Sequence, residues 1–242
     1  MKTDRLSVSL AVATAAALVA TMYGAFLWAP TEKTMGNVQR IFYIHVPSAW
    51  TAFAAFFVVF IASVGYLVTK NFKWDRIALA CAEIGTIFCT VVLITGPIWA
   101  KPVWGIWWTW DARLTSTLVL WLMYLSYLLL RDFLDEPARR ATLSAVFGII
   151  AFVDVPIVFF SIRLWRTQHP QPVLMGGVDS GLDPTMFKVL MLAWVAFTIL
   201  FVFLAVLRVR LEKSRDEVRQ LRREIATLKA LLEQKGQAPV GR

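Results

Sequence analysis

Six long apolar segments constrain the fold of this chain more than any other feature of its sequence. Each is about 20 residues long, enough to cross a hydrocarbon core of about 30 Å as an α-helix. The segments are Leu6–Trp28, Pro47–Val68, Ile77–Trp99, Leu114–Leu130, Ala141–Leu164 and Phe187–Leu207. The sequence therefore predicts an all-α, polytopic membrane protein with six transmembrane helices.

The composition and the lengths of these spans leave no room for a soluble catalytic domain. Of the 242 residues, 58% are hydrophobic and only 17% are charged, a balance that does not suit a soluble globular domain. We expect residues 1–207 to form a six-span membrane domain. Residues 208–242 are expected to form a basic, helical tail.

The distribution of basic residues predicts which side of the membrane each connection faces. Most of the 25 Lys and Arg residues lie before the first span, between the second and third, between the fourth and fifth, and in the tail. By the positive-inside rule these segments are cytoplasmic, so both termini are expected in the cytoplasm. The net charge of +9 then reflects membrane topology, and no nucleic acid is expected as a partner.

The three connections on the outer side carry the residues best suited to binding a ligand. They cover about residues 30–46, 100–113 and 165–186. The first contains His45 and the third contains His169, the two histidines of the chain, while the second reads WGIWWTWDARLTS from residue 104. If these loops converge, two imidazoles flank a platform of indole rings.

A porphyrin is a ligand that fits this combination of side chains. Indoles offer a large stacking surface with a polar N–H, and imidazoles are suitable axial ligands for haem iron. The anionic propionates of haem suit planar guanidinium groups. The cations placed to meet them, or to play a structural part, are Arg113, Arg163 and Arg166.

Each of these residues also has an ordinary interpretation. Interfacial tryptophans commonly form an aromatic belt, although the five from Trp99 to Trp110 exceed what a belt explains. A loop histidine is more often solvated than bound to a metal. Because both histidines lie on the same side as the indoles, metal binding and simple solvation are equally good interpretations here. Arginines near a span end can extend to lipid headgroups, and this interpretation is favoured for Arg166.

Asp111 follows the tryptophan run directly and has two possible roles. Its carboxylate either pairs with Arg113 or caps the N-terminus of the following span. If residues 104–111 are helical, Asp111 shares a face with two of the indoles.

Two ionisable residues lie inside apolar spans, where charge is unfavourable unless it is paired or faces a polar cavity. Glu83 in the third span is as well explained by internal hydrogen bonding as by function. Asp154 in the fifth span precedes Pro156, which can open the helix and free backbone groups. Either residue could shape a pocket or bind a partner subunit.

The stretch GPIWAKPVWGIWWTWDARLTS, residues 96–116, resembles the tryptophan-rich WWD signature of haem-handling membrane proteins. With QRIFYIHVPSAW before it and DVPIVFFSIRLWRTQH after it, the chain is similar to the cytochrome c maturation protein C family. In other branches the aspartate is usually followed by Pro and an acidic residue, whereas Ala and Arg follow it here. The resemblance covers about residues 38–208.

The resemblance implies a multi-pass protein of the bacterial inner membrane that acts in cytochrome c biogenesis. His45 and His169 would be axial ligands of a non-covalent haem b on the periplasmic side. The positions that match the signature would form the haem platform and dock a periplasmic haem chaperone: Trp104, Trp107, Trp108, Trp110 and Asp111. The family's usual partners are ATP-binding-cassette subunits and a very small membrane subunit.

The chain lacks the motifs that it would need to use ATP or to attach haem covalently. It has neither a GxxxxGK[ST] nucleotide loop nor a CxxCH haem-attachment motif. ATP use and covalent capture of haem are therefore expected of partners. The residues leave its status as an enzyme open and favour a non-enzymatic role in haem transfer.

The tail departs from the family pattern, which ends soon after the sixth span. Its residues fit a heptad repeat: Leu211, Val218, Ile225 and Leu232 fall at a; Ser214, Leu221, Leu228 and Lys235 fall at d. This pattern favours a parallel two-stranded coiled coil, by self-association or with another partner. The alternative is a single amphipathic helix with its basic face near anionic lipid.

Two rival functions fit parts of the sequence. A membrane cytochrome b-type electron carrier generally holds two haems with four histidines deep in the bilayer, whereas this chain has two histidines near span ends. A permease subunit for another apolar solute would use the indoles as its vestibule. Haem transfer to a chaperone would exclude the first, and porphyrin absorbance would exclude the second.

Overall fold

The computed structural model describes residues 5–165, 169 and 182–236, with side chains up to residue 229. Six of its helical segments are long and apolar enough to cross a membrane, which confirms the predicted all-α, six-span fold. These segments are Arg5–Trp28, Asn37–Thr69, Phe72–Trp104, Ala112–Asp132, Pro137–Leu164 and Pro184–Lys229.

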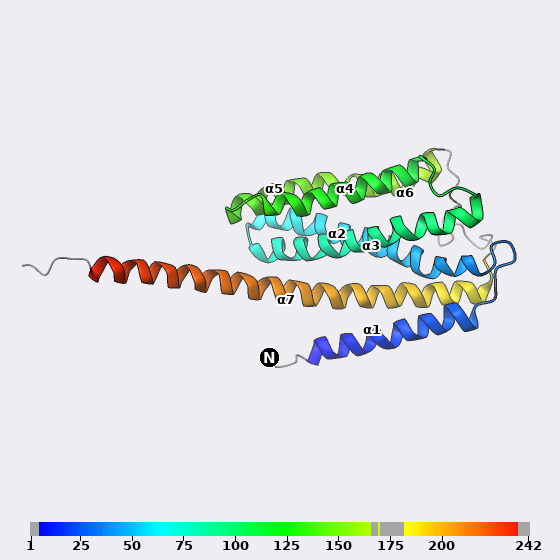
Figure 1. Ribbon diagram of the computed structural model, residues 1–242, viewed down its shortest axis with the longest axis horizontal. Coiled ribbons are helices and arrows are strands. Elements are labelled where there is room, and N and C mark those ends of the chain that lie inside the picture. The colour runs from blue at the N-terminus through cyan, green and yellow to red at the C-terminus, as the bar shows by residue number, and fades with distance from the viewer. Residues whose placement is uncertain (1–4, 166–168, 170–181, 237–242) are drawn as a thin grey trace, which may run out of the picture.

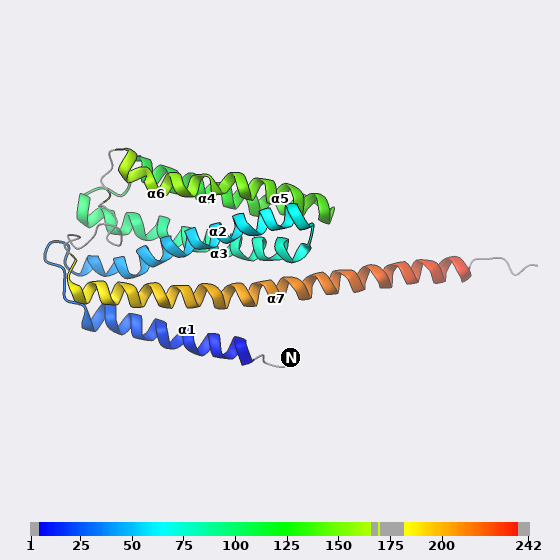
Figure 2. The ribbon, with the colours of Figure 1, turned by 180° about the vertical axis from the view of Figure 1, so that it is seen from behind.

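The helices pack side by side in a layered bundle (Figures 1 and 2). In chain order they are α1 (Arg5–Tyr23), α2 (Phe42–Thr69), α3 (Phe72–Trp104), α4 (Ala112–Asp132), α5 (Pro137–Phe152), α6 (Asp154–Leu164) and α7 (Pro184–Gly236). Helices α2 and α3 pack along each other, α1 lies against α7, and α5 contacts α2 and α4. One end of the bundle, here named the loop end, carries residues 29–41 and 105–111; the opposite end, from which α7 projects, is named the tail end.

Local sequence explains where the helices start and stop at the tail end. Helix α2 ends at Thr69, and the left-handed backbone of the next residue, Lys70 (φ 54°), turns the chain. Asn71 then caps α3, because its side chain accepts a hydrogen bond from the Lys73 backbone N–H. Glu136 caps α5 in the same way, and Pro137 occupies the first helical turn, where its missing N–H costs little.

The fifth span is broken into α5 and α6 at Val153. Pro156 lies three residues further on, and a proline inside a helix clashes with the carbonyl four residues before it. This break agrees with the helix opening predicted near Pro156. Asp154 begins α6 and is 8% exposed, and within the described chain its Oδ2 has no hydrogen-bond partner.

Gly85 contributes to the close packing of α2 on α3. Phe56 of α2 stacks on Tyr124 of α4, with ring centroids 3.6 Å apart, and both rings are fully buried. A Cβ at Gly85 of α3 would lie 2.5 Å from the Phe56 ring. Small residues let helix backbones approach closely inside a membrane, so Gly85 makes room for this aromatic stack.

Charged side chains near the tail end connect α3 to α4 and α7. Arg131 donates two hydrogen bonds to buried Asp75, at 2.6 and 2.7 Å. Glu83 accepts hydrogen bonds from Arg208 of α7, which also bonds Glu212 at 2.7 Å. Glu83 is therefore internally paired, which was one of its two predicted interpretations.

Helix α7 runs without interruption through the boundary predicted between residues 207 and 208. The sixth span and the tail are one continuous helix. The division of the chain into a membrane domain and a tail remains a prediction about function.

Candidate haem site

His45 lies on the first turn of α2, so its predicted place in an outer loop is wrong. Helix α2 starts before Pro47 because Phe42 and Tyr43 are buried against α7, where they pack with Val189 and Leu190. That burial extends the helix toward the loop end. His45 is consequently held by a regular helix.

The His45 ring is oriented by a hydrogen bond from α3. Its Nδ1 lies 2.8 Å from Thr95 Oγ1, and this hydroxyl lies 2.7 Å from the carbonyl of Val91. The hydroxyl has one proton, which it donates to Val91, so it accepts from His45 Nδ1–H. The tautomer that results leaves Nε2 with its lone pair, the form that binds metals.

Thr95 is the site residue that sequence reasoning missed. It lies one helical turn before Trp99, so both residues face α2 from the same side of α3. Nothing in the local pattern indicated that this hydroxyl contacts His45, because the contact depends on how α2 and α3 pack.

Trp99 is the indole nearest to His45. The two ring centroids are 5.7 Å apart, and Phe42 contacts the same indole at 6.1 Å. The Trp99 Nε1–H is buried and, among the described residues, has no hydrogen-bond acceptor. A buried donor of this kind is suited to a polar group of a ligand.

His169 contacts both ends of the tryptophan stretch. Its ring centroid is 5.4 Å from that of Trp104, and its Nδ1 is 4.0 Å from Asp111 Oδ2. Burial lowers the pKa of His169 to about 4, with Arg113 lowering it further and Asp111 opposing the shift. The imidazole is therefore neutral at pH 7, as an iron ligand must be.

The tryptophan stretch is not helical after Trp104, so the shared helical face considered for residues 104–111 does not form. Helix α3 ends there because Gly105 takes a left-handed backbone (φ 79°), which glycine adopts without strain. Trp107 and Trp110 are 57% and 77% exposed. Trp108 is partly buried, and its ring centroid is 5.7 Å from that of Trp110.

Asp111 caps α4, which was one of its two predicted roles. Its Oδ1 accepts hydrogen bonds from the backbone N–H groups of Arg113 and Leu114, at 2.9 and 3.0 Å. Its Oδ2 accepts from the Thr109 hydroxyl at 2.8 Å. This carboxylate therefore fixes the end of the tryptophan stretch to the start of a membrane span.

The three predicted propionate cations differ in their surroundings. Arg113 donates from Nη2 to the backbone carbonyls of Val158 and Phe159 in α6, and its buried Nε has no partner among the described residues. Arg163 is exposed in the last turn of α6. Arg166 lies outside the described residues.

The structure brings the two histidines to the same end of the bundle. Both His169 and Arg113 act electrostatically on His45, so the three side chains lie within reach of one another's charge. No group of three or more His, Cys, Asp or Glu among the residues described could hold a metal ion. A metal bound between the imidazoles would need ligands from elsewhere, which a porphyrin supplies.

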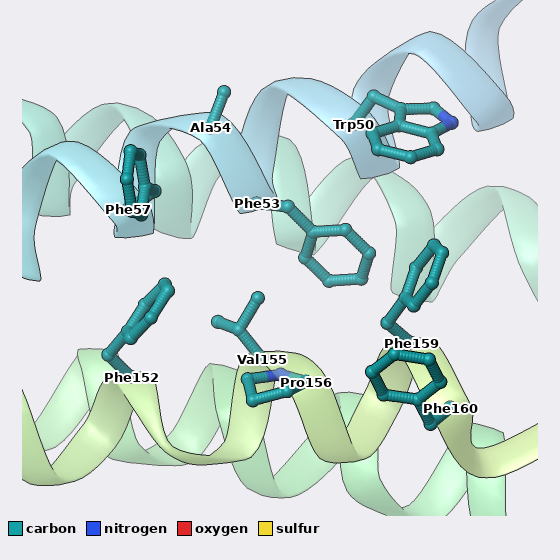
Figure 3. Close-up of a pocket in the computed structure, with 9 residues that line it drawn as sticks. All are labelled: Trp50, Phe53, Ala54, Phe57, Phe152, Val155, Pro156, Phe159 and Phe160. Atoms are coloured by element: carbon teal, nitrogen blue, oxygen red, sulfur yellow. The ribbon is translucent and has the colours of Figure 1, made fainter.

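A separate apolar groove lies between α2 and the α5–α6 pair (Figure 3). It has a volume of about 480 Å³ and is lined by Trp50, Phe53, Ala54, Phe57, Phe152, Val155, Pro156, Phe159 and Phe160. Neither histidine lines it, and its walls carry no charged side chain. This groove therefore lacks the ligands and cations that a haem requires.

Known proteins similar to this chain share almost its full length. The model of the family described as heme exporter protein C matches residues 1–224. A heme exporter protein C of Bradyrhizobium diazoefficiens is 39% identical over 219 residues, covering 90% of this chain and 83% of the relative. The Escherichia coli protein of the same name is 32% identical, covering 88% and 87%.

Proposed function

Because the chain belongs to the heme exporter protein C family, we propose that it handles haem in cytochrome c maturation, holding it at the loop end for transfer. The observation that carries the proposal is that two neutral imidazoles lie at that end. His45 is held in the tautomer with a free Nε2 lone pair, and His169 is uncharged at pH 7.

In this proposal His45 and His169 would hold the iron of a non-covalent haem b. The buried N–H groups of Trp99 and Trp108, with Arg113 Nε, supply donors for its polar edge. Iron ligation is the chemistry that haem itself brings. The protein contributes orientation of the ligands and a surface of indole rings.

The exposed part of the tryptophan stretch is the proposed docking surface for a periplasmic haem chaperone. Trp107 and Trp110 are exposed at the loop end, and exposed aromatic residues are common anchors in protein interfaces. Asp111 holds this surface in place through its cap on α4. The chaperone, which attaches haem covalently, would take the haem from this edge.

The proposal places the protein in the bacterial inner membrane, with the loop end periplasmic and the tail end cytoplasmic. The excess of basic residues at the tail end supports this orientation. ATP-binding-cassette subunits and a small membrane subunit are the proposed partners, since this chain has no nucleotide-binding loop. A membrane-impermeant thiol reagent tests the orientation, because Trp107→Cys should react in intact cells and Lys70→Cys only after permeabilisation.

Absorption spectroscopy tests the ligand assignment. Haem is titrated into the purified protein and into the His45→Ala and His169→Ala variants, with Phe57→Leu in the apolar groove as the control. We expect a bis-imidazole spectrum in the wild type and the control, and loss of that spectrum in each histidine variant. Unchanged spectra in both histidine variants would refute the assignment.

A transfer assay separates the proposal from its two rivals. Haem-loaded protein is mixed with the purified chaperone, and the absorbance of each is followed after separation. We expect haem to move to the chaperone. Retention of haem would favour an electron carrier, and absence of porphyrin absorbance after haem addition would favour a permease subunit.

A further inference from the structure

Helix α7 is much longer than a membrane span requires. Its 53 residues extend for about 80 Å, whereas a hydrocarbon core is about 30 Å thick. Its C-terminal part projects past the tail ends of the other helices and keeps the direction of the spanning part (Figures 1 and 2). This part therefore points away from the membrane, which a helix lying flat on lipid does not do.

At its base, one face of the projecting helix packs against the chain's own body. Glu212 is 6% exposed and bonds Arg208, and Asp216 pairs with Arg76 of α3 at 3.2 Å. With Leu211 at heptad position a, Glu212 falls at b and Asp216 at f. Positions b and f lie on the back of a coiled-coil helix, so the internal contacts leave the a/d face open.

The a/d face beyond this base is apolar and exposed. Val218 and Ile225 at a are 48% and 53% exposed, and Leu221 and Leu228 at d are 57% and 60% exposed. Leu232 continues the pattern at the next a position. We name residues 218–232 the tail seam. A row of large apolar side chains in water is the feature that a partner helix buries.

The charges that flank the tail seam specify what kind of partner fits. Glu217 and Glu224 fall at g, and Arg222 and Lys229 fall at e. In a parallel pair of identical helices, g faces the following e of the partner, so Glu217 meets Arg222 and Glu224 meets Lys229. An antiparallel pair would set g against g and e against e, which places like charges together.

Membrane insertion imposes the same parallel direction. Two copies in one bilayer have the same orientation, so their projecting helices leave the membrane side by side in register. β-Branched residues at a with leucine at d favour two strands. We propose that the tail seams of two copies of this chain pair as a parallel, two-stranded coiled coil.

The surroundings of the seam define where the pairing begins. Ser214 occupies the d position before Val218, and Arg215 at e is engaged with Glu212 of its own helix at 3.6 Å. Pairing therefore starts at Val218, clear of the body. The seam is only about two heptads long, and confinement to one membrane raises the effective concentration that so short a seam needs.

Disulfide cross-linking in native membranes tests the seam. Cys81 and Cys89, both buried, are replaced by alanine, and single cysteines are placed at Leu221→Cys or Leu228→Cys. The matched controls are Gln220→Cys and Thr227→Cys, one residue earlier at position c. We expect several-fold more dimer on mild oxidation from the seam positions than from the controls.

A charge exchange distinguishes pairing of two copies from other ways of covering the seam. Glu224→Lys or Lys229→Glu alone places like charges across the dimer, so cross-linking through Leu221→Cys should fall. The double exchange restores opposite charges and should restore the dimer. These two residues are five positions apart and do not face each other within one helix. If the helix stays unpaired, the double exchange should therefore restore nothing.

Three outcomes would overturn the proposal. They are equal cross-linking at seam and control positions, a cross-linked product whose mass includes another protein, and seam cysteines that react only with lipid-soluble reagents. The second would identify a different helical partner, and the third would identify a helix embedded in lipid.

Discussion

Replacement of Thr95 by valine is the sharpest test of how His45 is prepared for a ligand. Valine keeps the shape of threonine and removes the hydroxyl that lies 2.8 Å from His45 Nδ1. Without that acceptor, the ring proton no longer prefers Nδ1 to Nε2, and the ring is also free to rotate. The predicted effect is weaker haem binding by a protein that still folds.

The size of this effect follows from two contributions. Free choice between the two neutral tautomers halves the fraction of His45 in the binding form, a factor of about 2. A buried hydrogen bond contributes about 1 kcal/mol net, or a factor of about 5 in affinity. Together they predict a rise in the haem dissociation constant of about tenfold, at the lower end of the 10- to 100-fold range for partners that orient a metal ligand.

Thr86→Val is the matched control for this prediction. Thr86 also lies in α3 and donates to the carbonyl four residues earlier at 2.7 Å, as Thr95 does, but it does not contact His45. Both variants are titrated with haem and followed by absorbance, with thermal stability recorded in parallel. A dissociation constant for Thr95→Val within twofold of wild type, or an equal rise in Thr86→Val, would refute the reasoning.

Two further variants test parts of the structure that support the site. Asp111→Ala removes the α4 cap and should lower the free energy of unfolding by about 1 kcal/mol. Asp111→Asn keeps a capping oxygen and should retain most of that stability. Equal melting temperatures for the two variants would contradict this role. Arg131→Met leaves Asp75 buried without its cation. It should lower the free energy of unfolding by about 3–5 kcal/mol, which would be seen as a large fall in melting temperature. Adding Asp75→Asn to this variant should recover part of the lost stability. No recovery in the double variant would argue against an unpaired charge as the cause.

The fold was predictable because each span is a long apolar run. The six predicted segments match the observed ones in number and order, and they differ mainly at their ends. The ends depend on packing between helices, which the pattern along one helix does not contain. His45 is the clearest case, because burial of Phe42 and Tyr43 against α7 starts α2 several residues before Pro47.

The candidate site was predictable as a set of residues but only partly as an arrangement. Both histidines and the indoles gather at one end, as their positions next to span ends indicated. The left-handed backbone at Gly105 ends α3. The helical spacing of the tryptophans and Asp111 does not indicate this end. Arg113 donates to carbonyls of α6, a contact that depends on how α4 and α6 pack.

Helix α7 joins the two ends of the molecule as a single rod. Near its start Val189 and Leu190 pack on Phe42 and Tyr43, directly before His45 in α2, and its far end carries the tail seam. Because the rod has no hinge between these points, a sideways displacement of the tail would tilt its opposite end. Displacement of the tail therefore has a direct route along α7 to the start of α2, where His45 lies.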